Sequence, residues 1–190
     1  MKEPFLEKPL RRLRIRKILK YIPKNGVICD IGCGPEPNFL LNLGEKIGEG
    51  WGIDKKTISK KWSDRVQTIR YDLDSIDNIS ILPFSENKFD CLLVIAVSEH
   101  LKFLEKVLKE SHRILKPGGI IVLTTPTIIA KPILEFLAFR TNMVSREEIK
   151  DHKYYYSKKE LINILNASGF GNIKHHYFEL RFNQIINAQK

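Results

Sequence analysis

The sequence predicts an α/β fold built on a doubly wound, mostly parallel sheet of seven strands. The first observation is that apolar strand-like runs alternate with helix-like runs along the first 126 residues, a pattern typical of a parallel sheet with helices on both faces. The second is that residues 27–37 contain a buried strand followed at once by a glycine-rich turn. Glycine is needed where the backbone bends sharply or comes close to a ligand, so this turn marks a binding site.

Length and composition favour one domain spanning residues 1–190. The chain is long enough to bury a sizeable core. No stretch approaches the ~18 apolar residues of a membrane span, and the charged start of the chain differs from a secretory signal. Three cysteines, an odd number with no C-x-x-C spacing, favour reduced thiols. We therefore expect a cytoplasmic protein.

The chain is strongly basic, with 32 lysines and arginines against 22 acids and a net charge of +10. This balance favours anionic partners such as phosphorylated metabolites, RNA or an acidic membrane. The densest basic run, residues 11–20, lies in an N-terminal basic segment (1–25) that predicts an amphipathic helix over 9–22. We expect that helix to lie on the sheet with its basic face in solvent. Contact with RNA or a membrane is the alternative.

The first strand, 26–31, ends in Asp30, and Gly32 and Gly34 flank one small residue before a helix predicted over 37–47. The turn lacks the G-x-G-x-x-G spacing that cradles a pyrophosphate. An acid directly before the glycines would repel a phosphate. The turn therefore favours a cationic ligand.

A second strand, 50–54, ends in Asp54, which follows Asp30 by 24 residues. A carboxylate at that strand end can accept hydrogen bonds from two ribose hydroxyls. A short helix is expected next, over 56–62. The remaining expected elements of the first 126 residues are strands at 65–71, 89–95 and 119–125 and a helix at 99–115.

Several motifs occur in a specific order, and together they resemble the class I S-adenosylmethionine (SAM) dependent methyltransferases over residues 26–126. They are Asp-Ile-Gly-Cys-Gly at 30–34, the acid at 54, Asp-Leu at 72–73, Glu-His-Leu at 99–101 and Leu-Lys-Pro-Gly-Gly at 115–119. The resemblance implies that the chain binds SAM and releases S-adenosylhomocysteine. It implies a cofactor site formed by Asp30, Gly32, Cys33, Gly34, Asp54, Lys55, Asp72, Leu73 and Ala96. Cys33 is expected there as a small residue, in preference to a nucleophile.

The pattern changes after residue 126. Residues 127–140 are apolar on almost all sides of a helix that would contain Pro132. We expect them to cover the site as a lid, to pack in a homodimer or to face lipid, within an insert over 127–156. A helix capped by Ser157 follows. Runs at 171–179 and 181–189 then correspond to the C-terminal hairpin that the resembled family adds as an antiparallel sheet edge.

Catalytic residues are only weakly indicated, because the sulfonium of SAM is already an activated methyl donor. Methylation of a hydroxyl would need a base, for which His100 and His152 are the candidates. These two histidines and Tyr154 are also the expected substrate contacts. Quinone-biosynthesis O-methyltransferases, which resemble the chain around Glu99, bind a divalent metal through two glutamates and a histidine. Here Ala96 replaces the first glutamate, so we expect no metal dependence.

The expected acceptor is a small or lipid-linked molecule that is anionic or partly apolar. The alternatives are an RNA-modifying methyltransferase and a non-catalytic SAM-binding protein. Residues 95–98 lack the Asn/Asp-Pro-Pro-Tyr motif with which base amino-methyltransferases bind a flipped base. Methylation of cytosine at C5 needs a nucleophilic cysteine near this strand end, but Cys91 lies inside a predicted strand. Nucleic acid is therefore the less favoured partner. Peripheral membrane contact and a homodimer stay open.

Overall fold

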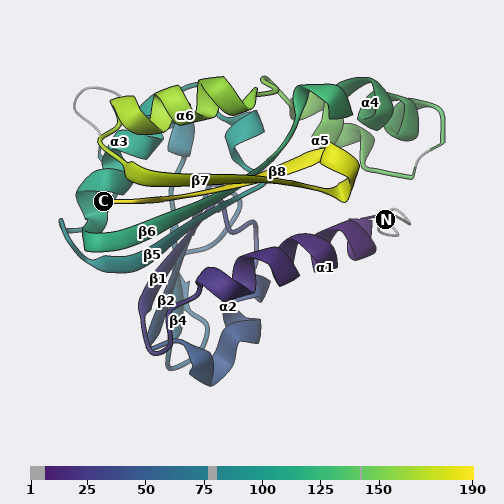
Figure 1. Cartoon of the computed structure of the whole chain (residues 1–190). Helices are drawn as coiled ribbons and strands as arrows, with labels where there is room; N and C mark the ends of the chain where they lie inside the picture. The colour runs from purple at the N-terminus through teal and green to yellow at the C-terminus, as the bar shows by residue number, and fades with distance from the viewer. Residues whose placement is uncertain (1–6, 77–80, 142) are drawn as a thin grey trace.

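The structure is a computed structural model that describes residues 7–76, 81–141 and 143–190. Residues 1–6 of the expected N-terminal segment and Asn142 of the expected insert lie outside the described residues. The strands are β1 (Val27–Ile31), β2 (Glu49–Asp54), β3 (Lys60–Lys61), β4 (Val66–Arg70), β5 (Phe89–Ile95), β6 (Leu115–Pro126), β7 (Gly171–Phe178) and β8 (Asn183–Gln189). All of them join one sheet in the order β3-β4-β2-β1-β5-β6-β8-β7 (Figure 1).

The central strands pair in parallel, and β8 runs antiparallel to both of its neighbours, β6 and β7. The sheet order changes direction at β1, which pairs with β2 on one side and β5 on the other. This confirms the mostly parallel, doubly wound sheet with a C-terminal antiparallel hairpin. The seven expected strands are present, and β3 adds a short eighth.

The prediction of a helix over 56–62 was wrong, because this segment contains the short strand β3. Lys60 and Lys61 pair antiparallel with β4. Thr68 explains the extended backbone, because its Oγ1 donates to the carbonyl of Ile58 (2.6 Å) and accepts from Trp62 Nε1 (2.7 Å). These hydrogen bonds to β4 hold the segment extended, in place of the backbone hydrogen bonds that a helix would form within itself.

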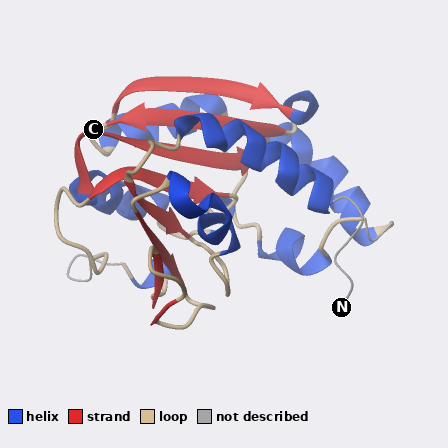
Figure 2. Cartoon of the chain, turned by 90° about the horizontal axis from the view of Figure 1, so that it is seen from below, coloured by secondary structure: helices blue, strands red, loops and turns tan. Residues whose placement is uncertain are grey.

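Helices cover both faces of the sheet (Figure 2). They are α1 (Glu7–Ile18), α2 (Asn38–Leu43), α3 (Leu104–Ile114), α4 (Lys131–Phe139), α5 (Arg146–Asp151) and α6 (Lys158–Ala167). The helix expected over 99–115 begins only at Leu104, because a 3₁₀ turn at Ser98–His100 precedes it and Leu101 is extended. The predicted cap of α6 is confirmed: Ser157 Oγ accepts from the Glu160 amide, and the Glu160 carboxylate accepts from the Ser157 amide.

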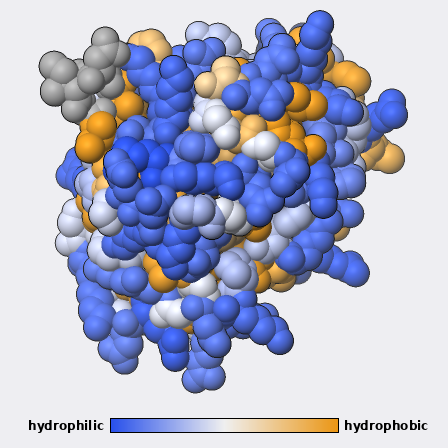
Figure 3. Space-filling model, turned by 60° about the vertical axis from the view of Figure 1, so that its left-hand side comes forward, coloured by the Kyte–Doolittle hydropathy of each residue, from blue (hydrophilic) through white to orange (hydrophobic). Residues whose placement is uncertain are grey.

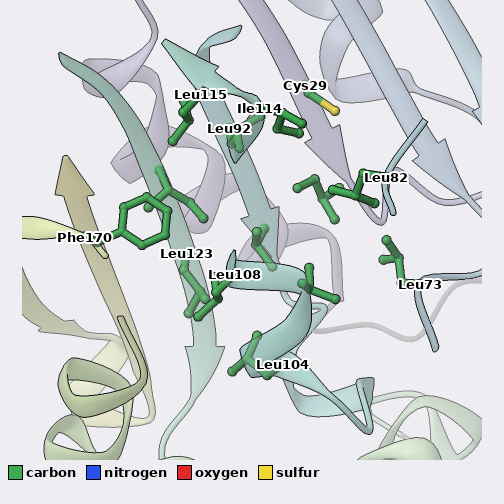
Figure 4. Packing of buried hydrophobic residues seen from close by; sticks show 14 of the residues in the cluster. Cys29, Leu73, Leu82, Leu92, Leu104, Leu108, Ile114, Leu115, Leu123 and Phe170 are labelled. Carbon is green, nitrogen blue, oxygen red and sulfur yellow. The ribbon is translucent and has the colours of Figure 1, made fainter. Parts of the chain in front are cut away.

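Alternating side chains of β5 supply two buried layers. Leu92 and Val94 pack in a cluster with α3 and α6, whereas Cys91 and Leu93 pack in a second cluster with α1 and α2. Figure 4 shows the first cluster. Each fully buried leucine contributes about 1.5–3 kcal/mol, so these layers hold the strand ends in place for the site.

The surface is largely charged, and large apolar side chains are exposed at several places among the described residues. The face in Figure 3 is covered mainly by hydrophilic side chains. Elsewhere, a short 3₁₀ turn and α4 expose large apolar side chains, which we call the α4 surface: Ile128, Ile129, Ile133, Phe136 and Phe139. Among the described residues, no helix is long and apolar enough to cross a membrane.

Candidate functional site

A cavity of about 840 Å³ opens at the carboxyl ends of β1, β2, β4 and β5. Its size lies in the upper part of the range for ligand sites. Residues of α1 line one side, and residues of the α4–α5 region line another; Figure 1 shows these helices converging at that end of the sheet. The expected cofactor residues all line this cavity except Asp30, which is buried in β1.

The two turn glycines have different roles. Both have a positive φ, +84° at Gly32 and +75° at Gly34, which L side chains rarely adopt. A Cβ on Gly32 would lie 2.3 Å from Val97 Cγ2, whereas a Cβ on Gly34 would meet nothing within 4 Å. Packing therefore requires the first glycine, and the second leaves space in the cavity.

Cys33 is packed against the sheet. Its Sγ would lie 2.7 Å from a Cβ placed on Gly52 of β2. Burial, with the negative charges of Asp30 and Asp54, raises the pKa of the Cys33 thiol far above its ordinary value. A protonated thiol is a poor nucleophile, which supports the interpretation of Cys33 as a small turn residue.

Two carboxylates at the ends of β1 and β2 prepare the cavity for a cation. Burial, together with the nearby charge of Asp54, raises the pKa of Asp30 to about 7. Asp54 accepts hydrogen bonds from the amides of Gly34 (3.0 Å) and Lys56 (2.7 Å). A carboxylate offers about four acceptor sites, so Asp54 retains capacity for ribose hydroxyls. An ammonium group bound nearby would favour the ionised form of Asp30.

The end of β5 is strained at Ala96, which has φ +53° although it is not glycine. Its amide donates to the carbonyl of Thr124 (2.9 Å) on β6, which holds it in place. The chain turns here away from the sheet, and Val97, Glu99 and His100 then line the cavity.

The acceptor side of the cavity joins two segments far apart in sequence. The amides of Lys153 (2.7 Å) and Tyr154 (3.2 Å) both donate to the carbonyl of Glu99. As a result, the rings of His100 and His152 lie edge to face, 4.8 Å apart. Both histidines that the sequence indicated therefore meet in the cavity.

His152 is a neutral imidazole at neutral pH. Burial, followed by the charges of His100 and Arg14, lowers its pKa to about 4. Its Nδ1 lies 2.9 Å from the hydroxyl of Tyr155, a contact that orients the ring. Beside it, burial raises the pKa of Glu99. The cluster of Glu99, His100 and His152 also has the chemistry of a metal-binding site, because one ligand atom from each lies within 4.8 Å of the others.

Some expectations for this side need correction. Tyr154 does not line the cavity: its side chain is half-exposed, with the ring 5.9 Å from that of Tyr156. Arg14 lines the cavity, so the basic face of α1 is not wholly in solvent. The Arg14 Nε is buried without a hydrogen-bond partner among the described residues. The basic run indicated this helix but not which arginine faces inward.

Comparisons with known proteins agree with the fold and with SAM as the cofactor. The family described as "Methyltransferase domain" matches residues 5–175. An uncharacterised protein of Methanocaldococcus jannaschii is 28% identical over 165 residues, covering 84% of this chain and 71% of its own. A demethylmenaquinone methyltransferase of Bacillus licheniformis is 25% identical, covering 84% and 77%.

The fold itself recurs among solved structures. A SAM-dependent methyltransferase from Archaeoglobus fulgidus superposes with a TM-score of 0.68 at 19% identity, covering 97% of this chain and 95% of its own. The family match spans nearly the whole chain, and the cavity carries the turn and strand-end acids expected of a SAM site. The chain therefore belongs to the methyltransferase-domain family and is a SAM-dependent methyltransferase.

Proposed function

We propose that this enzyme methylates a small or lipid-linked acceptor that combines an apolar body with an anionic group. The observation that carries the proposal is the unpartnered, buried Nε of Arg14 in the cavity wall. A buried donor without a partner is costly, and an anionic group on the acceptor would satisfy it. Leu10, Leu134 and Val144 line the same cavity and suit an apolar body.

The proposed mechanism assigns separate tasks to the two sides of the cavity. Bound SAM supplies an electrophilic methyl group on its sulfonium. Asp30 and Asp54 favour the ammonium and ribose of the cofactor, while the glycine turn leaves it space. On the acceptor side, the neutral His152 can accept a proton from a hydroxyl or amine of the acceptor, and Tyr155 holds the ring in position.

The α4 surface supports an acceptor attached to lipid. Leu134 of α4 lines the cavity, while Ile129 and Phe136 of the same segment are more than half exposed. Lys131 and Arg140 are exposed at the two ends of the helix. An apolar surface flanked by basic side chains fits an anionic membrane. A relative is named for a demethylmenaquinone substrate, which is apolar and uncharged, so it supports the apolar body of the acceptor and not its anionic group.

The test is transfer of labelled methyl from SAM into an extract, followed by identification of the product and kinetics with the purified acceptor. Arg14→Gln should raise the acceptor KM about tenfold or more, because a hydrogen bond to a charged group contributes roughly 1.5–3 kcal/mol. SAM affinity should stay unchanged. Arg16→Gln is the matched control, since Arg16 lies on the same helix, is exposed and does not line the cavity.

Two results would refute this assignment. The first is an Arg14→Gln enzyme with the acceptor KM of the wild type. The second is a labelled acceptor with no anionic group. Absence of any labelled product, with SAM still bound, would favour the non-catalytic alternative.

A further inference from the structure

The cluster of Glu99, His100 and His152 has a geometry that goes beyond the proton acceptance assigned to His152 in the proposed mechanism. A metal ion bound to the second ring nitrogen of His152 would replace that role, because Nδ1 contacts the Tyr155 hydroxyl. Glu99, His100 and His152 place one carboxylate and two imidazoles around a common point, with their ligand atoms all within 4.8 Å of one another. The carboxylate is buried and the two histidines are partly buried. From this geometry we propose that the three residues bind one divalent transition-metal ion on the acceptor side of the cavity.

The distances are close to those that a metal needs. Nitrogen and oxygen ligands lie about 2.0–2.2 Å from Zn²⁺, so two ligands in a tetrahedral site are about 3.4 Å apart. The farthest pair here must approach by roughly 1.4 Å, a movement that rotation of two side chains can share. The rings of His100 and His152, already 4.8 Å apart edge to face, do not block this movement.

Two of the three side chains, Glu99 and His152, also have a second partner that orients them. Glu99 Oε2 accepts from the hydroxyls of Thr125 (3.0 Å) and Ser98 (3.3 Å). His152 Nδ1 contacts the Tyr155 hydroxyl at 2.9 Å. Metal-binding side chains characteristically have such partners, which fix the ring and the carboxylate.

The third side chain has an acidic partner. His100 Nδ1 lies 3.2 Å from Asp151 Oδ2, at an angle outside hydrogen-bond geometry. The negative charge of Asp151 beside the ring would favour a cation bound to His100. Hydrogen bonds therefore orient Glu99, a contact with Tyr155 orients His152, and a nearby carboxylate supports His100.

The third ligand, His152, lies far in sequence from Glu99 and His100, so no contiguous motif contains this metal site. The sequence predicts no metal site because Ala96 replaces a glutamate, an argument that considers only the residues near Glu99. His152 comes from the segment after α5, and the Lys153 and Tyr154 amides bind it to the Glu99 carbonyl. Two imidazoles and one carboxylate suit Zn²⁺, Fe²⁺ or Mn²⁺ and leave positions open for an acceptor hydroxyl or carboxylate.

Arg14 supplies the competing explanation. Its positive charge acts on both Glu99 and His152, so the cluster could serve as a hydrogen-bonded acid–base group without any metal. Metal binding itself does not depend on the proposed methyl transfer. A role of the ion in holding the acceptor does rest on that function, so binding and turnover are measured separately.

The test uses the full chain after overnight dialysis against a chelator. Titration with Zn²⁺ by calorimetry should show one site, and Co²⁺ should give visible absorption bands characteristic of nitrogen and oxygen ligands. His152→Ala and Glu99→Gln should each weaken Zn²⁺ binding by more than the roughly 10–100-fold that follows loss of a group bonded to a metal ligand. Tyr155→Phe removes such a group, so its loss of affinity should fall within that range. His176→Ala, at an exposed histidine on β7, is the matched control and should bind like the wild type.

Circular dichroism and SAM titration identify any variant that fails to fold. The proposal is overturned if the wild type binds no Zn²⁺ up to millimolar concentration. It is also overturned if His152→Ala retains wild-type affinity, or if the loss in His176→Ala equals the loss in His152→Ala. Since SAM binding is measured on the same samples, a failure here leaves the methyltransferase assignment intact.

Discussion

At the scale of single residues, the cofactor side of the cavity depends on a buried acid that is only partly ionised in the free protein. Asp30 has a pKa of about 7 because burial and the charge of Asp54 disfavour its carboxylate. In the free enzyme, protonation as the pH falls through 7 relieves this cost and stabilises the fold. The proposed contact of Asp30 with the ammonium of SAM needs the ionised carboxylate, so we expect the SAM affinity to change in the opposite direction.

We therefore expect SAM to bind roughly fivefold more weakly at pH 6 than at pH 7.5, where most Asp30 carboxylates are ionised. Calorimetry across this range, in which the α-ammonium of SAM stays largely protonated, measures the effect. Asp30→Asn should bind SAM weakly and without this pH dependence. An equally steep profile in Asp30→Asn would assign the titration to another group.

Replacing each of the two turn glycines should have a different effect, on stability at Gly32 and on SAM binding at Gly34. Gly32→Val places its side chain into Val97, so it should lower the unfolding temperature. At Gly34 an added Cβ would meet no protein atom within 4 Å, and the positive φ adds backbone strain of about 1–2 kcal/mol. Gly34→Val should therefore fold but lose SAM binding. Thermal unfolding with SAM titration checks both. A folded Gly34→Val that binds SAM normally would contradict its place in the cofactor site.

At the scale of elements, α4 shows how one segment can serve both the cavity and the surface. Leu134 lines the cavity, whereas Ile129 and Phe136 face outward. Pro132 lies in the first turn of the helix, where a missing amide hydrogen costs nothing. Pro132 is therefore compatible with the helix that begins at Lys131.

The double variant Ile129→Gln/Phe136→Gln should lose most of its sedimentation with phosphatidylglycerol vesicles, because it removes apolar area from the α4 surface. SAM affinity should not change. Ile58→Gln, at an apolar side chain that is also more than half exposed, is the matched control. Leu134→Gln should instead raise the acceptor KM. If the double variant converts a dimer into a monomer and vesicle binding persists, the α4 surface is an interface between subunits.

The elements that the sequence predicted well are those whose signals are local. Strand β1, its turn and the acids at 30 and 54 form a continuous pattern. The structure places the turn and Asp54 at the cavity, whereas Asp30 is buried in β1. The helix expected over 56–62 failed because Thr68, outside that segment, binds it in an extended form. Local propensity contains no information about such a partner.

At the scale of the whole molecule, the same distinction separates the two sides of the cavity. The cofactor side is assembled from ends of neighbouring parallel strands, so the order of motifs predicts it. The acceptor side needs α1 and the segment after α5 to reach the same cavity as the turn at residues 98–100. Arg14 and Asp151 have no motif in common, and only the fold brings them to the cavity, where Tyr155 contacts the His152 ring.

The position of β8 has a consequence for how the molecule is made. This strand lies between β6 and β7 but follows both along the chain, and its pairing joins Ile120 to Gln189. While the polypeptide emerges from the ribosome, β6 presents an open edge and β7 has no partner until residues 183–189 arrive. An open edge is a template for pairing with other chains, and contacts between distant residues form slowly. Nascent chains that stall before residue 183 are therefore the form of this protein most exposed to aggregation and most dependent on chaperones.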